Sequence, residues 1–261
     1  MRWTTVLGVV VLVGVLACGK APEPDAAPTR VAAAADLIHA FEEIGGAFER
    51  ASGDPVAFSF GSTGLLAKQI EGGAPFDVFA AADVSFVDEV VRAGACDEET
   101  RTLYARGRLA IWVRGTTVTP PTSLRDLTDP RFQRIAIANP EHAPYGLAAR
   151  QALEDIGAWH SVEPRLVYGE NVRQALQFAE TGNVDAAIVA LSLVVHDQDH
   201  PWVLVDQSHH RTIDQALVVC GGGANRAGGE AFVRFLGSEP GRAITRRHGF
   251  VLPDESAERD P

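Results

Sequence analysis

The sequence lacks the short motifs that mark the common enzyme classes. It has no GxSxG nucleophile elbow, because the glycines of Gly61-Ser62-Thr63-Gly64 have the wrong spacing. It also has no Walker loop, no GxGxxG fingerprint and no HExxH zinc motif. Asp77 and Asp83 could be read as paired carboxylates, but a strand residue and a helix cap are the favoured interpretation. We therefore expect a protein that is not an enzyme.

Basic residues are fewer than acidic residues. The chain of 261 residues has 23 Lys and Arg against 34 Asp and Glu, which gives a net charge of −11. An acidic surface argues against binding to nucleic acid and against adhesion to anionic lipid. It does not exclude a small anion, because backbone dipoles aimed at a site act locally whatever the net charge.

Cysteine is scarce, and the sequence shows no metal-binding spacing. There are three cysteines, with no CxxC and no Cys/His zinc pattern. The histidines at 196, 200, 209 and 210 are better explained as exposed connections between strands than as metal ligands. Three tyrosines, none of them adjacent, make a Tyr-based ferric site less plausible. Cys96 and Cys220 could pair or could remain as buried thiols, and the sequence leaves both possibilities open.

No apolar run is long enough to span a bilayer. Val6–Ala17 is almost wholly apolar but falls short of the ~20 residues that a spanning helix needs. It fits a signal peptide over residues 1–17. The run ends in Val15-Leu16-Ala17-Cys18, which resembles a lipobox and implies lipid attachment at Cys18; a signal peptide that merely contains a cysteine is the alternative. Residues 18–28 are rich in Ala and Pro and predict a flexible tether.

Strand patterns alternate with helix patterns along the rest of the chain, which predicts parallel-rich sheets covered by helices. Four junctions share one form, in which a strand runs through a short loop into a capped helix. Such a junction leaves unpaired N–H groups and a partial positive charge, and ligands of open α/β sheets lie outside the carboxyl ends of the strands. A single junction would be read as an ordinary turn, but four facing one another across a cleft predict one anion cage. The junctions are Ala35/Asp36, Ser62/Thr63, Tyr145/Gly146 and Gly169/Asn171.

Several segments of the chain are specific enough to suggest a family. The most specific is the run Ala67-Lys-Gln-Ile followed by Gly-Ala-Pro-Phe-Asp-Val-Phe and Ala-Asp83, and three shorter segments support it: Asn139-Pro-Glu-His, Glu170-Asn-Val-Arg and Arg247-His-Gly-Phe. Together they resemble the periplasmic molybdate-binding proteins of ABC importers (ModA-like), which are type II solute-binding proteins. The resemblance extends from about residue 31 to residue 252.

The resemblance implies an α/β, two-lobed periplasmic-binding-protein fold. Each lobe is expected to be a mixed, mostly parallel sheet flanked by helices, and the chain is expected to cross the hinge twice. Lobe one would comprise residues 29–107 and 221–254, lobe two residues 108–220, and residues 255–261 would form a tail.

The resemblance also implies a function. The protein would capture a tetrahedral oxyanion, molybdate or tungstate, between the lobes, without a cofactor. It would act as a monomer in the periplasm or at the cell surface, anchored through Cys18, and deliver the ligand to the membrane subunits of an ABC importer. The alternatives are a binding protein for sulfate, phosphate or an organic anion, or a sensor or enzyme on the same fold.

The family's ligand-binding positions fall on a defined set of residues in this chain. Two of them depart from the family, because Asp36 replaces a serine and Ala190 replaces a tyrosine, although Ser192 could reach inward. A carboxylate at ~4 Å from a dianion costs several kcal/mol unless it is screened. We therefore hypothesise that Asp36 turns its carboxylate onto the N–H groups of its own helix while its backbone N–H faces the ligand. The predicted ligand-binding set is Asp36, Ser62, Thr63, Tyr145, Asn171, Val172, Ala190 and Ser192.

Overall fold

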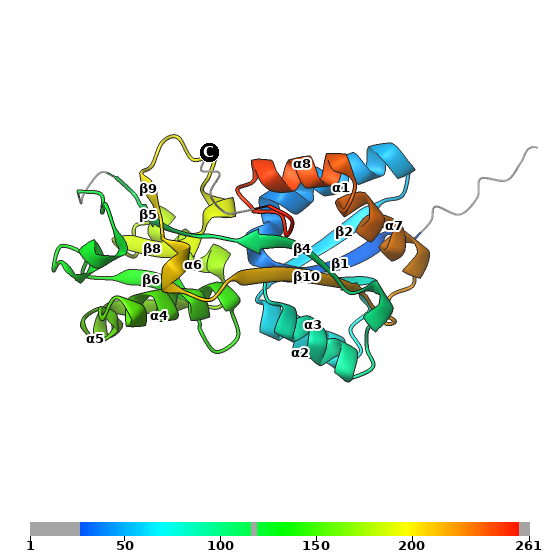
Figure 1. Ribbon diagram of the computed structural model, residues 1–261, viewed down its shortest axis with the longest axis horizontal. Coiled ribbons are helices and arrows are strands. Elements are labelled where there is room, and N and C mark those ends of the chain that lie inside the picture. The colour runs from blue at the N-terminus through cyan, green and yellow to red at the C-terminus, as the bar shows by residue number, and fades with distance from the viewer. Residues whose placement is uncertain (1–26, 116–118, 256–261) are drawn as a thin grey trace, which may run out of the picture.

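Two five-stranded sheets, each covered by helices, lie end to end along the long axis of the molecule (Figure 1). The computed structural model describes residues 27–115 and 119–255. The predicted signal peptide, Cys18, most of the tether and the tail beyond residue 255 lie outside the described residues. No helix within the described ranges is long and apolar enough to cross a membrane. The predicted α/β, two-sheet fold class is confirmed.

The first sheet has the strand order β2-β1-β3-β10-β4. β1 runs parallel to β2 and β3, whereas β10 is antiparallel to β3 and β4. Helices α1, α7 and α8 cover one face, and α2 and α3 cover the other (Figure 1). The elements are β1 (Thr29–Ala34), α1 (Ile38–Ser52), β2 (Val56–Gly61), α2 (Thr63–Glu71), β3 (Val78–Ala81), α3 (Val84–Arg92), β4 (Thr102–Gly107), β10 (Ile213–Val219), α7 (Arg226–Leu236) and α8 (Glu239–Arg247).

The second sheet has the order β7-β6-β8-β5-β9. β6 is parallel to β7 and β8, and β5 is antiparallel to β8 and β9. Its elements are β5 (Leu109–Val113), β6 (Ile135–Ala138), α4 (Pro144–Asp155), α5 (Trp159–Val162), β7 (Leu166–Gly169), α6 (Val172–Glu180), β8 (Ala186–Ala190) and β9 (Trp202–Leu204).

The chain passes from the first sheet to the second at Arg108, between β4 and β5, and returns to the first sheet with β10. The sequence division placed residues up to 220 in lobe two, and this return point is corrected, because β10 pairs with β3 and β4. The physical reason is that an apolar run predicts a strand but does not say which sheet receives it. The strand β4 was also not predicted.

The core around the first sheet is built from small and aromatic side chains. Ala32 and Ala33 of β1 are fully buried, which lets helices approach both faces of the strand. Leu37, Phe41, Ile44 and Phe48 recur at helical spacing, which predicts one apolar stripe, and all four are buried. Leu37 lies in a short 3-10 turn, Ala35–Leu37, ahead of α1. Phe41 and Phe48 of that stripe pack edge-on against Phe232 of α7.

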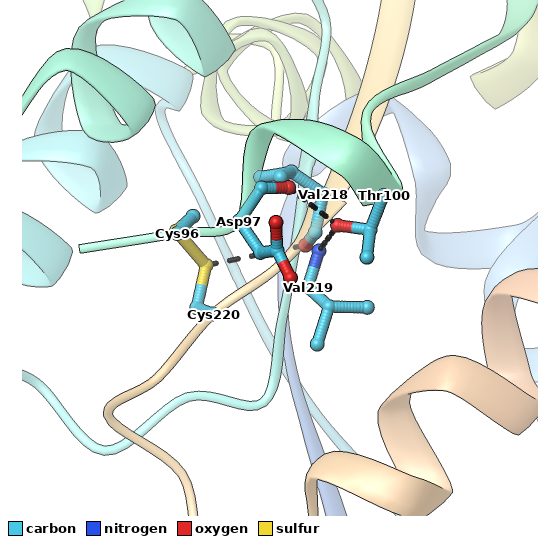
Figure 2. Close-up of a disulfide and its surroundings, with 6 residues drawn as sticks. All are labelled: Cys96, Asp97, Thr100, Val218, Val219 and Cys220. Atoms are coloured by element: carbon cyan, nitrogen blue, oxygen red, sulfur yellow. Dashed lines mark hydrogen bonds between the residues drawn. A yellow bond between two sulfur atoms is a disulfide. The ribbon is translucent and has the colours of Figure 1, made fainter. Parts of the chain in front are cut away.

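Cys96 and Cys220 form a disulfide, which settles the alternative left open by the sequence (Figure 2). The bond joins the segment after α3 to the residue that follows β10. Beside it, the Asp97 N–H donates to the Val219 carbonyl at 2.9 Å, and the Val219 N–H donates to Thr100 Oγ1 at 2.9 Å. The end of β10 is therefore fixed to the segment after α3 by the disulfide and by these hydrogen bonds.

Candidate functional site

The four predicted junctions meet at one small cavity between the two sheets. Its volume is about 10 Å³, far below that of the other cavities, so it suits a compact ligand. Larger cavities of about 310 and 440 Å³ lie elsewhere, at β4 with α7 and α8 and near β9, and neither gathers helix N-termini. The small cavity is lined by Ala34, Ala35, Asp36, Gly61, Ser62, Thr63, Ala82, Ala143, Pro144, Tyr145, Asn171 and Val172.

Helix beginnings supply the polar character of this cavity. Thr63 is the first residue of α2, Val172 the first of α6, and Tyr145 the second of α4. The first amides of a helix have no carbonyl partner within the helix, and they carry the positive end of its dipole. Among the lining residues there is no Lys or Arg. The arrangement therefore suits an anion held by neutral donors.

Asn171 is the N-cap of α6, as predicted. Its side-chain oxygen accepts a hydrogen bond from the Gln174 N–H at 3.0 Å. The cap fixes the direction in which the first turn of α6 faces the cavity. At α4 the corresponding device is Pro144, which starts the helix at a position where no N–H donor is required.

Ser62 lies at the N-cap position of α2 but makes no cap bond with its side chain. Its Oγ lies 2.7 Å from the carbonyl oxygen of His142 and 2.8 Å from His142 Nδ1, in the segment that leads into α4. The Gly64 N–H also donates to the His142 carbonyl, at 2.9 Å. The start of α2 and the start of α4 are thus joined directly across the boundary between the halves.

Thr63 is 1% exposed and accepts a hydrogen bond from the Ala82 N–H at its Oγ1, over 3.3 Å. A hydroxyl that accepts from one side keeps its own hydrogen for a second partner. Thr63 is therefore a donor available to a ligand in the cavity.

Asp36 does not cap its own helix, which makes the hypothesis for its carboxylate wrong. The residue lies inside the 3-10 turn rather than at its cap, and the turn has no side-chain cap bond. Its carboxylate accepts instead from Gln215 Nε2, which also lies 3.1 Å from the Tyr145 hydroxyl. Tyr104 completes this buried network by donating its hydroxyl to Gln215 Oε1 at 2.9 Å.

The charge of Asp36 is strongly affected by this environment. Burial raises the pKa of Asp36 to about 6, against the opposing effect of the hydrogen bond from Gln215 and of the nearby Tyr145 hydroxyl. Burial, together with the nearby Asp36 carboxylate, raises the pKa of Tyr104 and of Tyr145 well above the ordinary value. Asp36 Oδ1 is buried and has no hydrogen-bond partner among the described residues. The carboxyl group is therefore the titratable group of this network.

Two predicted site residues are not part of the lining. Ala190 is the last residue of β8, is fully buried and pairs with Leu109. Ser192 uses its Oγ to donate to the backbone carbonyl of Asp36 at 2.8 Å. It thus contacts a site residue from the other half of the molecule rather than the cavity.

The sequence analysis missed Gln215, Tyr104 and His142. Gln215 is fully buried in β10, and a polar residue next to the apolar run Ala216–Val219 was the available signal. Tyr104 lies on the strand that was not predicted. His142 contacts Ser62 through its backbone carbonyl as well as its ring. A contact made by the backbone cannot be predicted from the type of residue.

Replacing Gly64 with alanine is expected to disfavour the contact between the two halves of the molecule beside the cavity. A Cβ at this position would lie 2.9 Å from the His142 carbonyl oxygen and 3.1 Å from Phe86, so the two halves must separate locally. Small-angle scattering should report a larger radius of gyration for Gly64→Ala than for the natural protein. A matched control is Gly46→Ala in α1, where the nearest atom to the new Cβ is the mobile end of Arg50 at 3.3 Å. Equal radii for both variants would contradict the expectation.

Comparison with known proteins identifies the family. Residues 29–251 match the family described as bacterial extracellular solute-binding proteins. The chain belongs to this family. This solute-binding protein is 33% identical to the molybdate-binding protein ModA of Rhodobacter capsulatus over 236 residues, which cover 90% of this chain and 93% of the relative. It is also 33% identical to ModA of Escherichia coli K12, with 85% and 88% of the two chains covered.

A solved structure agrees with this assignment. The periplasmic molybdate-binding protein of Azotobacter vinelandii superimposes with a TM-score of 0.80 at 28% identity. The superposition covers 86% of this chain and 99% of that chain. The two-sheet architecture of this solute-binding protein is thus shared with a protein of the same size class.

Proposed function

We propose that this solute-binding protein binds molybdate in the cavity between its sheets and delivers it to the membrane subunits of an ABC importer. The observation that carries the proposal is the convergence of helix N-termini from both halves on one small cavity without Lys or Arg. Neutral donors suit a fully ionised tetrahedral dianion, because several N–H and O–H groups can share its charge. The names of the relatives supply the choice of oxyanion.

The two halves would act as lobes that close over the ligand. Ser62, Thr63, Tyr145, Asn171 and Val172 are the proposed contacts. The direct bonds between Ser62, Gly64 and His142 support closure as the binding-competent state, because they join the lobes beside the cavity. Closure is the change that the importer would recognise.

The remaining parts of the proposal concern the localisation of the protein and its ligand selectivity. Residues 1–17 would direct export, and Cys18 would carry a lipid that tethers a monomer in the periplasm or at the cell surface. The disulfide is consistent with an oxidising compartment outside the cytoplasm. Tungstate, with the same shape and charge as molybdate, would compete for the site. We assign no catalytic activity to the site, because the relatives are named as binding proteins.

A thermal-shift panel tests the ligand. Molybdate, tungstate, sulfate and phosphate would each be titrated against the full domain, and a true ligand raises the melting temperature with its concentration. We expect molybdate and tungstate to do so at lower concentrations than sulfate or phosphate. A response to sulfate or phosphate alone would replace the proposed ligand, and no response to any oxyanion would remove the proposed function.

Replacing Thr63 with alanine is expected to weaken molybdate binding by about 1–3 kcal/mol, the cost of losing one hydrogen bond to a charged group. Titration calorimetry would measure the change. The matched control is Thr128→Ala, because Thr128 is exposed and its hydroxyl donates to the Arg125 carbonyl away from the cavity. If Thr63→Ala and Thr128→Ala bind equally well, Thr63 is not a ligand contact.

A further inference from the structure

An acidic side chain lies in the cavity proposed for a dianion. We propose that this protein binds its oxyanion together with one proton, which Asp36 holds on Oδ1 and directs as a hydrogen-bond donor to a ligand oxygen. The proposal rests on the proposed function, and it makes Asp36 a specificity-determining residue of that same site. The proton comes from solvent, and no other bond is made or broken.

The geometry leaves one carboxyl oxygen unused. Asp36 is 1% exposed and lines the cavity with Thr63 and Tyr145. Its Oδ2 accepts from Gln215 Nε2, whereas Oδ1 is buried without a partner among the described residues. Buried polar atoms of native proteins nearly always have a partner, so an orphaned oxygen on a residue that lines the cavity calls for one.

Protonation changes what this oxygen can do. An ionised carboxylate only accepts hydrogen bonds, and it would repel a dianion at contact distance. A protonated carboxyl has one O–H donor, which is what an oxyanion oxygen requires. The neutral form of Asp36 therefore performs the task that a serine hydroxyl would perform, and the charged form opposes it.

Among the described residues, the side chains that hydrogen-bond to Asp36 are those of Gln215 and Ser192, and Gln215 bonds in turn to Tyr104 and Tyr145. Tyr104 and Tyr145 keep their protons, since burial and Asp36 both raise their pKa. His142 does not line the cavity, and its Nδ1 lies 2.8 Å from Ser62 Oγ. The facing groups by element are Tyr104 (β4), Tyr145 (α4), Gln215 (β10), Asn171 (the cap of α6) and Ser192 (the 3-10 turn after β8).

The direction of the pH dependence follows from linkage. Burial raises the pKa of Asp36 to about 6 before the ligand binds, so near neutral pH the carboxyl is mostly ionised. A neighbouring dianion raises this pKa further, because it disfavours a second negative charge. Between the two pKa values the complex holds one proton more than the free protein. In that window the affinity falls about tenfold for each unit of pH increase, and it is flat below the lower pKa.

Calorimetry measures the proton directly. Molybdate would be titrated into the protein at about pH 7.5 in HEPES and in Tris, whose ionisation enthalpies differ, and the difference in observed heat gives the number of protons exchanged. We expect an uptake that approaches one proton per molybdate. Molybdate itself is fully ionised at this pH and brings no proton.

The matched variant is Asp36→Asn, which has nearly the same shape, can donate from its amide and does not titrate. We expect it to exchange no proton and to bind molybdate with an affinity that is independent of pH. Natural protein that binds molybdate with zero proton uptake would overturn the proposal and leave the proposed function standing. Uptake that persists in Asp36→Asn would also overturn it and assign the proton to another group, such as His142. Failure of molybdate, tungstate, sulfate and phosphate to bind at every pH would end the proposed function instead.

Discussion

Replacing Cys96 and Cys220 together with alanine is expected to lower the free energy of unfolding by about 2–5 kcal/mol. The bond closes a loop with a sequence separation of 124 residues, and a crosslink across so long a loop removes much conformational freedom from the unfolded chain. Both cysteines are buried, so the loss of packing acts in the same direction. Urea unfolding, followed by tryptophan fluorescence, would measure the difference.

A reducing agent supplies the control for this prediction. Dithiothreitol should destabilise the natural protein by a comparable amount and leave the double variant unchanged, because that variant has no bond to reduce. If the natural protein unfolds at the same urea concentration with and without the reducing agent, the disulfide does not contribute to stability as argued. Figure 2 shows the hydrogen bond from the Val219 N–H to Thr100 Oγ1 beside the disulfide.

Replacing Phe232 with alanine is expected to lower the free energy of unfolding by about 3–5 kcal/mol. Phe232 is fully buried in α7, and its ring centroid lies 5.8 Å from that of Phe41, 5.6 Å from Phe48 and 5.9 Å from Phe58. Two of these rings are fixed on α1 and the third on β2, so they cannot all move to refill the space and a cavity remains. The same urea titration reports the loss.

An exposed aromatic residue gives the comparison for Phe232. Tyr168 in β7 is 45% exposed, and Tyr168→Ala should cost about 0.5 kcal/mol, as most surface substitutions do. If the two variants lost equal stability, the aromatic cluster would not be a principal support of the first half. Molybdate should still raise the melting temperature of Phe232→Ala, because Phe232 does not line the cavity.

Local patterns predicted the elements that form the site well. The apolar stripe with Phe41 and Phe48 predicted the buried face of the first helix, and Asn171 and Asp83 were predicted as caps. Both caps are confirmed, because each side chain accepts from an amide of its own helix. These features depend on residues close in sequence, so residue type and spacing suffice.

Long-range contacts account for what the sequence could not predict. Ser62 lies at the N-cap position of α2, but its hydroxyl donates a hydrogen bond to the carbonyl of His142, 80 residues away. The carboxylate of Asp36 was predicted to face its own helix, but it accepts a hydrogen bond from Gln215, 179 residues away. In both cases a partner brought close by the fold outcompetes the local one, and nothing in the local sequence identifies that partner.

The placement of β10 between β3 and β4 has a consequence for the order in which the protein acquires its structure. All five strands of the second sheet are synthesised before β10, so that half can mature while the first sheet still lacks an inner strand (Figure 1). Pairings of such long sequence separation form slowly. The first sheet therefore stays without one of its inner strands until most of the chain has been synthesised, and the exposed edges of β3 and β4 are open to wrong pairing during that time.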